Sequence, residues 1–294
     1  MRETEGQNNR PAYRVGRLSF RYPHDRDGQF GKGNEWALSG LTFEVLSGEV
    51  LGVIGPNGSG KTSLLKLLAR VLRPQEGEIH LFGSQIAEMS QDAIARLVAL
   101  VPQDSRQIFP FTIAETVMMG RFPHHRSKGR LLGFALECPE DIRLATQAMK
   151  ETDVVHLAQR SIDDVSGGER QRAIIARALA QQPKVLLLDE PTAFLDLNHQ
   201  LDICAILTRL NKDCGLTVIL ASHDLNLASQ YCDRLMLLKE GEIFRIASPE
   251  DIIRPDILEA VYRCEVLVDR HPESGVPRVT LPGREATHNV KRTS

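Results

Sequence analysis

The chain has 294 residues, of which 42% are hydrophobic and 25% are charged. This composition is typical of a globular protein that can bury a core. The 36 Lys and Arg side chains nearly balance the 38 Asp and Glu side chains, giving a formal net charge of −2, which argues against non-specific binding to nucleic acid. The five cysteines form no C-x-x-C pair, so we expect isolated thiols in a reducing compartment rather than disulfides or a zinc site.

The sequence shows no N-terminal targeting signal and no membrane-spanning run. The first ten residues, MRETEGQNNR, lack an apolar stretch, and no run in the chain approaches the ~18 apolar residues of a membrane span. We therefore expect a cytoplasmic protein that reaches a membrane only through a partner. Residues 1–11 and 283–294 are expected to be flexible tails around one domain of residues 12–282.

The predicted elements begin with an alternating stretch at residues 41–46, a turn at Ser47-Gly48 and a buried strand that ends at Gly55. A leucine-rich amphipathic helix follows and is stopped by Pro74. Further along, short apolar runs predict strands, and a 3.6-residue period predicts helices. Strands are expected at residues 77–83, 97–103, 184–190 and 216–222, a hairpin at 234–246, and helices at 113–119, 139–157, 169–182, 197–215 and from Ser248.

Strands and helices alternate through the middle of the chain, which predicts a mostly parallel sheet wound by right-handed crossovers. The β-rich start is expected to form an antiparallel subdomain. The segment of about residues 104–182 is expected to form a helical subdomain inserted into the same domain. The predicted fold class is therefore α/β.

The stretch GPNGSGKT, from Gly55 to Thr62, fits the phosphate-binding pattern G-x-x-x-x-G-K-[ST]. It follows a predicted strand and opens a predicted helix, which is the context that supports the motif. Glycines let backbone N–H groups converge on an anion, and the helix N-terminus adds its positive end. Lys61 is expected to reach the β- and γ-phosphates, and Thr62 to bind Mg²⁺.

Two carboxylates, Asp189 and Glu190, follow the apolar run VLLL. The carboxyl ends of strands in open α/β sheets are where ligands bind. One carboxylate there can hold Mg²⁺, and its neighbour can orient or deprotonate an attacking water. Taken alone, the pair would be interpreted as a solvated strand end, and the phosphate loop is what favours the functional interpretation.

Gln103 and His223 also end predicted strands. A lone Gln is usually a surface residue, and a lone His at a strand end is more often structural than catalytic. Their position at the expected nucleotide edge favours a role in the site without deciding it.

The stretch SGGE, from Ser166 to Glu169, begins another predicted helix. Ser and Glu three residues apart form a capping box, which can satisfy the free N–H groups of any helix start. A capping box does not explain the two glycines, each of which weakens a helix by about 1 kcal/mol relative to Ala. Their presence predicts that something approaches the backbone closely.

Six motifs in one order give this chain a family resemblance. They are Gly55–Thr62, Gln103, SGGE at 166–169, LLLDEP at 186–191, Leu195-Asp196 and His223. Over about residues 12–282 the chain resembles the nucleotide-binding subunit of an ABC transporter. In that family two subunits meet head to tail, and the S-G-G motif of one closes over ATP held by the phosphate loop of the other.

The resemblance implies ATP and Mg²⁺ as cofactors and assigns roles to these positions. It implies that Glu190 is the catalytic base, that His223 contacts the γ-phosphate and the water, and that Lys61 assists them. Thr62, Gln103 and Asp189 are implied as the metal site, and Asp196 as a bridge across the dimer. The implied nucleotide contacts are Tyr22, Gly55, Pro56, Asn57, Gly58, Ser59, Gly60, Lys61, Thr62, Ser63, Gln103, Ser166, Gly167, Gly168, Glu169 and Asp196.

Two details depart from the usual pattern of the family. An aromatic residue before the first strand usually stacks on adenine, and Tyr22 fits, but an insertion separates it from the phosphate loop and Trp36 is the alternative. Glu169 replaces the Gln that is commoner in this motif, a substitution that we expect to be harmless.

Four stretches narrow the resemblance. TVMMGRFPHHR, DEPTAFLDLNHQ, SHDLNLASQYCDRLMLLKEGEI and LEAVYRCEVLVDRHPESGVPRV are similar to the ATPases of importers for ferric siderophores, haem and cobalamin. The resemblance implies a homodimer under a permease dimer at the cytoplasmic face of the inner membrane, a substrate-binding protein that acts through the permease, and no nucleic-acid partner. A ferric siderophore is the first expectation for the cargo.

Rival interpretations predict different sequences. ABC ATPases that act on ribosomes usually carry two phosphate loops in one chain, and this chain has one. Relatives in DNA repair carry a long coiled coil between the loop and S-G-G, where residues 62–165 have no sustained heptads. If the chain were a phosphate-loop kinase or a GTPase, we would not expect the SGGE motif that it carries at residues 166–169.

Overall fold

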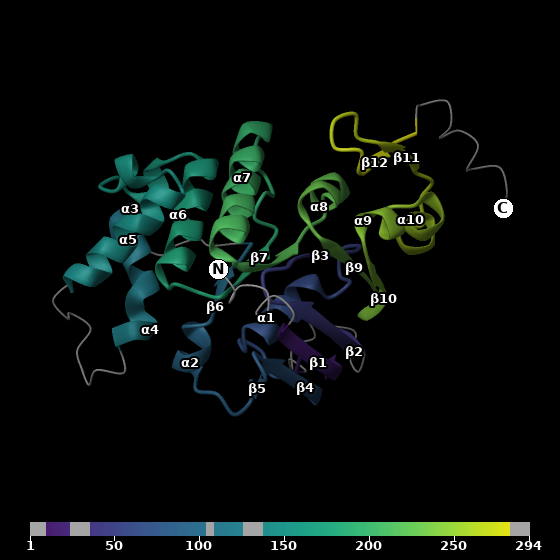
Figure 1. Ribbon diagram of the computed structural model, residues 1–294, viewed down its shortest axis with the longest axis horizontal. Coiled ribbons are helices and arrows are strands. Elements are labelled where there is room, and N and C mark those ends of the chain that lie inside the picture. Colours follow the sequence, from purple (N-terminus) through teal and green to yellow (C-terminus); the bar gives the residue numbers. More distant parts are fainter. Residues whose placement is uncertain (1–9, 24–35, 104–108, 126–137, 283–294) are drawn as a thin grey trace, which may run out of the picture.

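A computed structural model describes residues 10–23, 36–103, 109–125 and 138–282 (Figure 1). Apart from residues 10 and 11, both expected tails lie outside the described residues. Among the described residues, none of the helices has the length and apolarity needed to span a membrane.

A six-stranded sheet forms the centre of the fold, in the order β10-β9-β3-β8-β7-β6. The first five of these strands along the chain run parallel, and only β10 is antiparallel to its neighbour β9. The predicted parallel sheet is thereby confirmed. The strands are β3 (Val50–Ile54), β6 (Val98–Val101), β7 (Val185–Asp189), β8 (Thr217–Ala221), β9 (Arg234–Lys239) and β10 (Glu242–Ala247).

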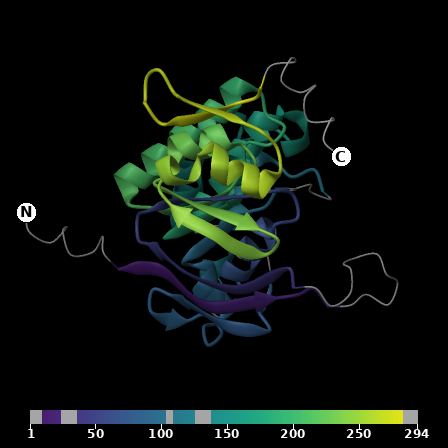
Figure 2. The same cartoon turned by 90° about the vertical axis from the view of Figure 1, so that its right-hand side faces the viewer.

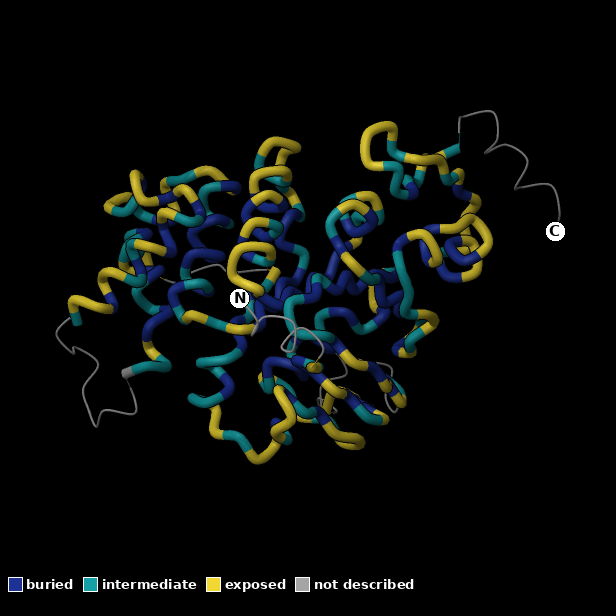
Figure 3. Tube along the Cα trace, viewed as in Figure 1, coloured by how far each residue is buried: buried dark blue, intermediate teal, exposed yellow. Residues whose placement is uncertain are grey.

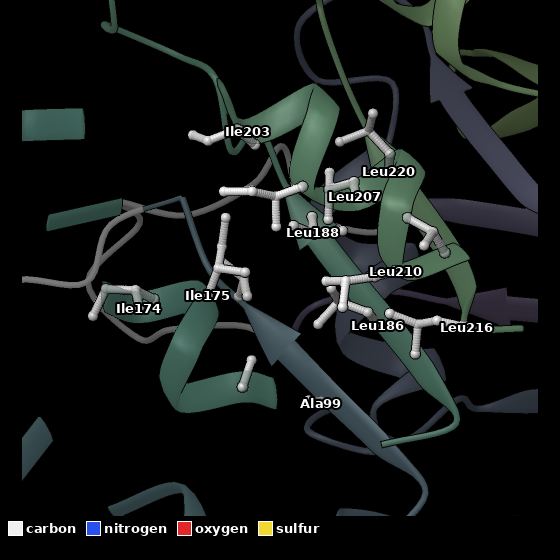
Figure 4. Packing of buried hydrophobic residues seen from close by; sticks show 14 of the residues in the cluster. Ala99, Ile174, Ile175, Leu186, Leu188, Ile203, Leu207, Leu210, Leu216 and Leu220 are labelled. Carbon is white, nitrogen blue, oxygen red and sulfur yellow. The ribbon is translucent and has the colours of Figure 1, made fainter. Parts of the chain in front are cut away.

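Both faces of this sheet are covered, which explains its continuous apolar strands. On β7, Leu186 and Leu188 point to one face and pack with helices α6 (Gly167–Ala180) and α7 (Leu197–Cys214) (Figure 4). Val185 and Leu187 point to the other face, towards helix α1 (Lys61–Leu68). In Figure 3 the buried residues (dark blue) lie along the central strands and along the helices that pack on them.

A second, antiparallel sheet lies on the α1 side, in the order β2-β1-β4-β5 (Figure 2). It confirms the expected N-terminal β subdomain. The Tyr13 hydroxyl donates to the Leu68 carbonyl (2.9 Å) and ties this sheet to the end of α1. Its strands are β1 (Pro11–Phe20), β2 (Leu38–Leu46), β4 (Glu76–Leu81) and β5 (Ser84–Gln85).

A helical layer stands beside α6 at one side of the molecule (Figure 1). It consists of α3 (Ile113–Met118), a 3-10 turn (Met119–Arg121), α4 (Phe122–His125) and α5 (Pro139–Glu151), while the short α2 (Gln91–Ala95) precedes β6. The helix predicted at 139–157 was too long. It ends at Glu151 because Asp153 takes a left-handed conformation (φ 55°), which an α-helix cannot contain. Arg70 (φ 53°) ends α1 early in the same way.

The C-terminal part packs beside α8 (Leu225–Tyr231). It contains α9 (Pro249–Ile252), α10 (Pro255–Tyr262) and a hairpin of β11 (Leu267–Arg270) and β12 (Pro277–Thr280) that we did not predict. The Asn226 side chain on α8 pairs with both backbone groups of Val279 (2.7 and 3.1 Å) and so completes the hydrogen bonding of that residue.

The helical layer contains a buried ion pair between Arg121 and Asp141 (2.9 Å), whose side chains are 6% and 9% exposed. Arg121 also donates to the Ala180 carbonyl at the end of α6 (2.6 Å). Asp141→Ala would leave a buried guanidinium without its counter-charge, so we expect the free energy of unfolding to fall by about 3–5 kcal/mol. Urea denaturation measures this effect.

The matched control is Glu140→Ala at the neighbouring position. Glu140 pairs with Arg143 at the surface, where such pairs contribute little. Equal losses of stability in the two variants would contradict our assignment of the buried pair as the interaction that holds α5 and α6 together.

Candidate functional site

The carboxyl ends of four parallel strands bring most of the predicted site residues to one edge of the sheet. β3 leads into the phosphate loop at Gly55, and β6 leads to Gln103. β7 ends at Asp189 and Glu190, while β8 leads to His223. This is the edge at which open parallel sheets bind ligands.

The phosphate loop wraps the start of α1, and its conformation depends on Gly60. This residue has φ 103°, and an added Cβ would lie 2.9 Å from the Ala37 carbonyl oxygen and nearer still to Leu38. A side chain there is therefore excluded by conformation and by space. The loop and the helix start together present backbone N–H groups and the positive end of the helix dipole to an anion.

Lys61 lies nearly buried inside this loop. Its ammonium donates to the carbonyls of Gly55 (2.9 Å) and Pro56 (3.2 Å). Burial lowers its pKa, whereas the charges of Glu190 and Asp189 raise it. A bound phosphate would add a further negative charge and so favour the charged ammonium that burial disfavours.

Thr62 and Asp189 bring two oxygen ligands together. The Thr62 hydroxyl donates to Asp189 Oδ1 (3.1 Å), and Asp189 is 4% exposed. Burial is the main cause that raises the pKa of this carboxyl, and the Thr62 hydrogen bond opposes it. A hydroxyl beside one carboxylate fits Mg²⁺, which takes few protein ligands and completes its shell with phosphate and water oxygens.

Glu190 contacts both of the other strand-end residues, Gln103 and His223. Its Oε2 accepts from Gln103 Nε2 (3.2 Å) and lies 3.0 Å from His223 Nδ1. Its backbone takes φ 51°, with its N–H bonded to the Ala221 carbonyl (3.0 Å). The family resemblance implied Gln103 at the metal site, and in the structure its amide nitrogen donates to this carboxylate.

These residues line a cleft of about 720 Å³. Tyr22 lies in it, with its hydroxyl 3.0 Å from Ser63 Oγ. Of the two aromatic candidates, Trp36 lies under the Arg21 guanidinium (5.2 Å) instead. The described lining residues are Tyr22, Ala37, Asn57, Gly58, Ser59, Gly60, Lys61, Thr62, Ser63, Gln103, Glu190, Phe194 and His223.

Phe194 is a cleft residue that the sequence analysis missed. It is 98% exposed and has φ 62°, which is rare for a bulky side chain. The signal was present as a large apolar residue in the short segment between Glu190 and Asp196. Nothing in the sequence indicated that its ring would be left in solvent.

The SGGE motif is not part of this cleft. It forms the predicted capping box at the start of α6, where Ser166 N donates to Glu169 Oε2 (2.8 Å) and Glu169 N to Ser166 Oγ (3.3 Å). The Ser166 contacts lower the pKa of Glu169. Ser166 and Gly167 are exposed. Asp196 is also outside the cleft and caps α7 through His199 N (3.1 Å).

Comparisons with known proteins agree with this arrangement. The sequence model of the ABC transporter family matches residues 38–193. The chain is 41% identical to the hemin import ATP-binding protein HmuV of Gloeobacter violaceus, covering 86% of this chain and 94% of that protein. It is 37% identical to the ferric enterobactin transport ATP-binding protein FepC of Escherichia coli, covering 87% and 92%.

A solved structure of similar fold is a dimeric ATP-binding cassette in a post-hydrolysis state, bound to ADP and Pi. It has a TM-score of 0.68 and 27% sequence identity, and covers 80% of this chain and 98% of that chain. The family model matches more than half of the chain, and the two relatives match it over most of their length and of its own. The chain belongs to the ABC transporter family, as an ATP-binding and ATP-hydrolysing subunit.

Proposed function

We propose that two copies of this chain share two ATP molecules and use their hydrolysis to drive import of an iron chelate through a membrane permease. One observation carries the proposal. A single copy assembles the phosphate loop, Glu190 and His223 in one cleft, with Asp189 bonded to Thr62 of that loop, yet leaves Ser166 and Gly167 exposed outside it. A second copy, facing the first across a two-fold axis, would supply the missing half.

Within one copy, the loop amides and Lys61 bind the triphosphate. Thr62 and Asp189 would hold Mg²⁺, which neutralises charge on the phosphate oxygens when bound. Glu190 accepts a proton from the attacking water, and Gln103 and His223 fix the orientation of its carboxylate through the contacts at 3.2 and 3.0 Å. His223 also faces the γ-phosphate, and Tyr22 takes the adenine.

The second copy would contribute Ser166, Gly167, Gly168 and Glu169 to the γ-phosphate side. The free N–H groups at the start of α6 suit an anion there. Asp196 and the exposed Phe194 lie on the face that this arrangement covers. Solved cassettes of similar fold form dimers, which supports the proposal.

The permease would dock beside Gln103, along the segment 109–125. Phe109 and Phe122 in this segment are 62% and 61% exposed, and exposed large apolar side chains are typical of protein contacts. The chain would thus act at the cytoplasmic face of the inner membrane and meet a substrate-binding protein only through the permease.

The cargo is proposed from the relatives, because no residue of the ATP cleft would contact a transported molecule. The two relatives are named for hemin and for ferric enterobactin. A ferric siderophore is our first proposal, with haem and cobalamin as alternatives. Growth of a deletion strain on single iron sources tests it, and unimpaired growth on every ferric siderophore and on haem would contradict it.

Mixing two defective variants tests the shared site. In a mixed dimer of Ser166→Arg and Lys61→Ala copies, one site combines an intact phosphate loop with an intact Ser166. With Glu190→Gln in both copies to block hydrolysis, we expect the mixture to retain more labelled ATP through gel filtration than the two variants retain separately. Retention no greater than the sum of the separate variants would contradict sharing between copies.

A further inference from the structure

The two adjacent glycines of the SGGE motif face different surroundings. Gly167 is exposed, and an added Cβ would meet only Leu195 Cδ2 at 3.5 Å, an ordinary van der Waals distance. Gly168 is buried, and an added Cβ would lie 2.6 Å from His199 Nδ1 and nearer still to two carbons of that ring. The space that Gly168 leaves empty is thus filled by a side chain of the same copy.

The His199 ring is held in this place. Its Nδ1 lies 3.3 Å from Arg172 Nη1, which also donates to Asp202 Oδ2 (3.1 Å). The Arg172 side chain is only 9% exposed. A guanidinium can only donate, so Nδ1 takes part in this hydrogen bond as the acceptor, in the tautomer that leaves it unprotonated; Asp202 Oδ2 lies 3.6 Å from the same Nδ1. If the ring turned away from Gly168, the buried Arg172 guanidinium would lose Nδ1 as a hydrogen-bond acceptor, which is costly.

The contact joins the starts of two helices. Gly168 and Arg172 belong to the first turns of α6, and His199 lies in the first turn of α7, where its N–H is capped by Asp196 (3.1 Å). Immediately before these helices lie Ser166 on one chain segment and residues 193–196 on the other. Figure 1 shows α6 and α7 side by side.

We propose that His199 is a positioning residue that fixes the SGGE motif against the segment 193–196, so that both meet the second copy as one rigid surface. On this account Gly168 is glycine because His199 occupies the place of its side chain, whereas the corresponding space at Gly167 is open for the approach of the second copy. The inference rests on the proposed site shared between copies and assigns the two glycines different tasks within it.

A pair of substitutions tests the inference through ATP-dependent dimerisation, measured by sedimentation in the Glu190→Gln background. Gly168→Ala must displace the ring, and we expect dimerisation at least 10-fold weaker. His199→Ala removes the positioning contact, and we expect a several-fold loss. In the double variant the methyl group added at position 168 would occupy the space that the ring has vacated, so dimerisation should recover to the level of His199→Ala alone.

The matched control is Gly167→Ala, alone and with His199→Ala. Since Gly167 does not face His199, removing the ring should give no recovery there. Binding of ATP to the separate copies and the thermal midpoint of each variant show whether a loss arises from the phosphate loop or from unfolding. Both should be close to the parent values in His199→Ala.

Two results would overturn the inference. Dimerisation unchanged in His199→Ala would mean that the ring positions nothing. A double variant no better than Gly168→Ala would mean that the nucleotide, and not His199, requires the glycine. Failure of the Glu190→Gln parent to dimerise with ATP would instead contradict the proposed shared site and would appear before any of these substitutions is made.

Discussion

Replacing Glu190 by Gln is expected to slow ATP hydrolysis by about 10²–10⁴-fold, the usual contribution of a positioned general base. The amide keeps the size of the side chain, and the backbone bond to Ala221 (3.0 Å) is unaffected. The amide, however, cannot accept a proton from water. Since binding of the triphosphate depends on other groups, ATP affinity should change little. Steady-state phosphate release and a binding titration measure the two effects.

The matched control is Glu44→Gln, a carboxylate on β2 that pairs with Arg14 at the surface (2.6 Å). It should hydrolyse ATP at the parent rate. If Glu190→Gln did the same, the base would be another group, and the contacts of Gln103 and His223 with Glu190 would have only a structural meaning.

Replacing Lys61 by Ala is expected to weaken ATP binding by roughly 10- to 100-fold. A hydrogen bond to a charged group contributes about 1.5–3 kcal/mol, and every ~1.4 kcal/mol is tenfold in affinity. Turnover should fall with it, because the γ-phosphate loses the positive charge of the Lys61 ammonium. Titration with a fluorescent ATP analogue measures the affinity, and Lys212→Ala, on the last turn of α7, is the control.

The Lys61→Ala variant is expected to fold. Among the described residues, the Lys61 ammonium donates its hydrogen bonds to the carbonyls of Gly55 and Pro56, in the loop itself. Ala is a good helix residue at the start of α1. Unchanged ATP affinity in the folded variant would contradict the assignment of the cleft as the nucleotide site.

The sequence predicted the edge of the sheet well, for a physical reason. Parallel strands buried on both faces are apolar throughout, so VLLLD and TVILA stand out, and the residue after each strand must lie at the same edge. Lys61, Gln103, Asp189, Glu190 and His223 could therefore be placed together before any contact was known.

Other features depended on contacts that no local pattern contains. α5 ends early at a left-handed Asp153, and hairpin β11–β12 is completed by an Asn226 side chain from another element. The sequence analysis expected ATP held by a second copy to approach the two glycines closely. It did not expect that His199, on the next long helix of the chain, would occupy the space beside Gly168.

The proposed shared site would also account for the exposure of Phe194 and Leu197, which are 98% and 67% exposed. Burying such side chains is worth about 25 cal/mol for each Å² of apolar surface, which favours association of two faces that carry them. In one copy they face solvent beside the cleft. In a closed pair they would contribute to the contact that excludes water from the γ-phosphate.

The mass of the Glu190→Gln chain in solution, with and without ATP and Mg²⁺, tests the central claim most directly. The chain has a mass of 32.8 kDa. Sedimentation equilibrium should give this mass without nucleotide and twice this mass with ATP, with one ATP bound for each chain. A species that binds ATP fully and still sediments as a single chain at concentrations well above the ATP dissociation constant would contradict a site built from two copies.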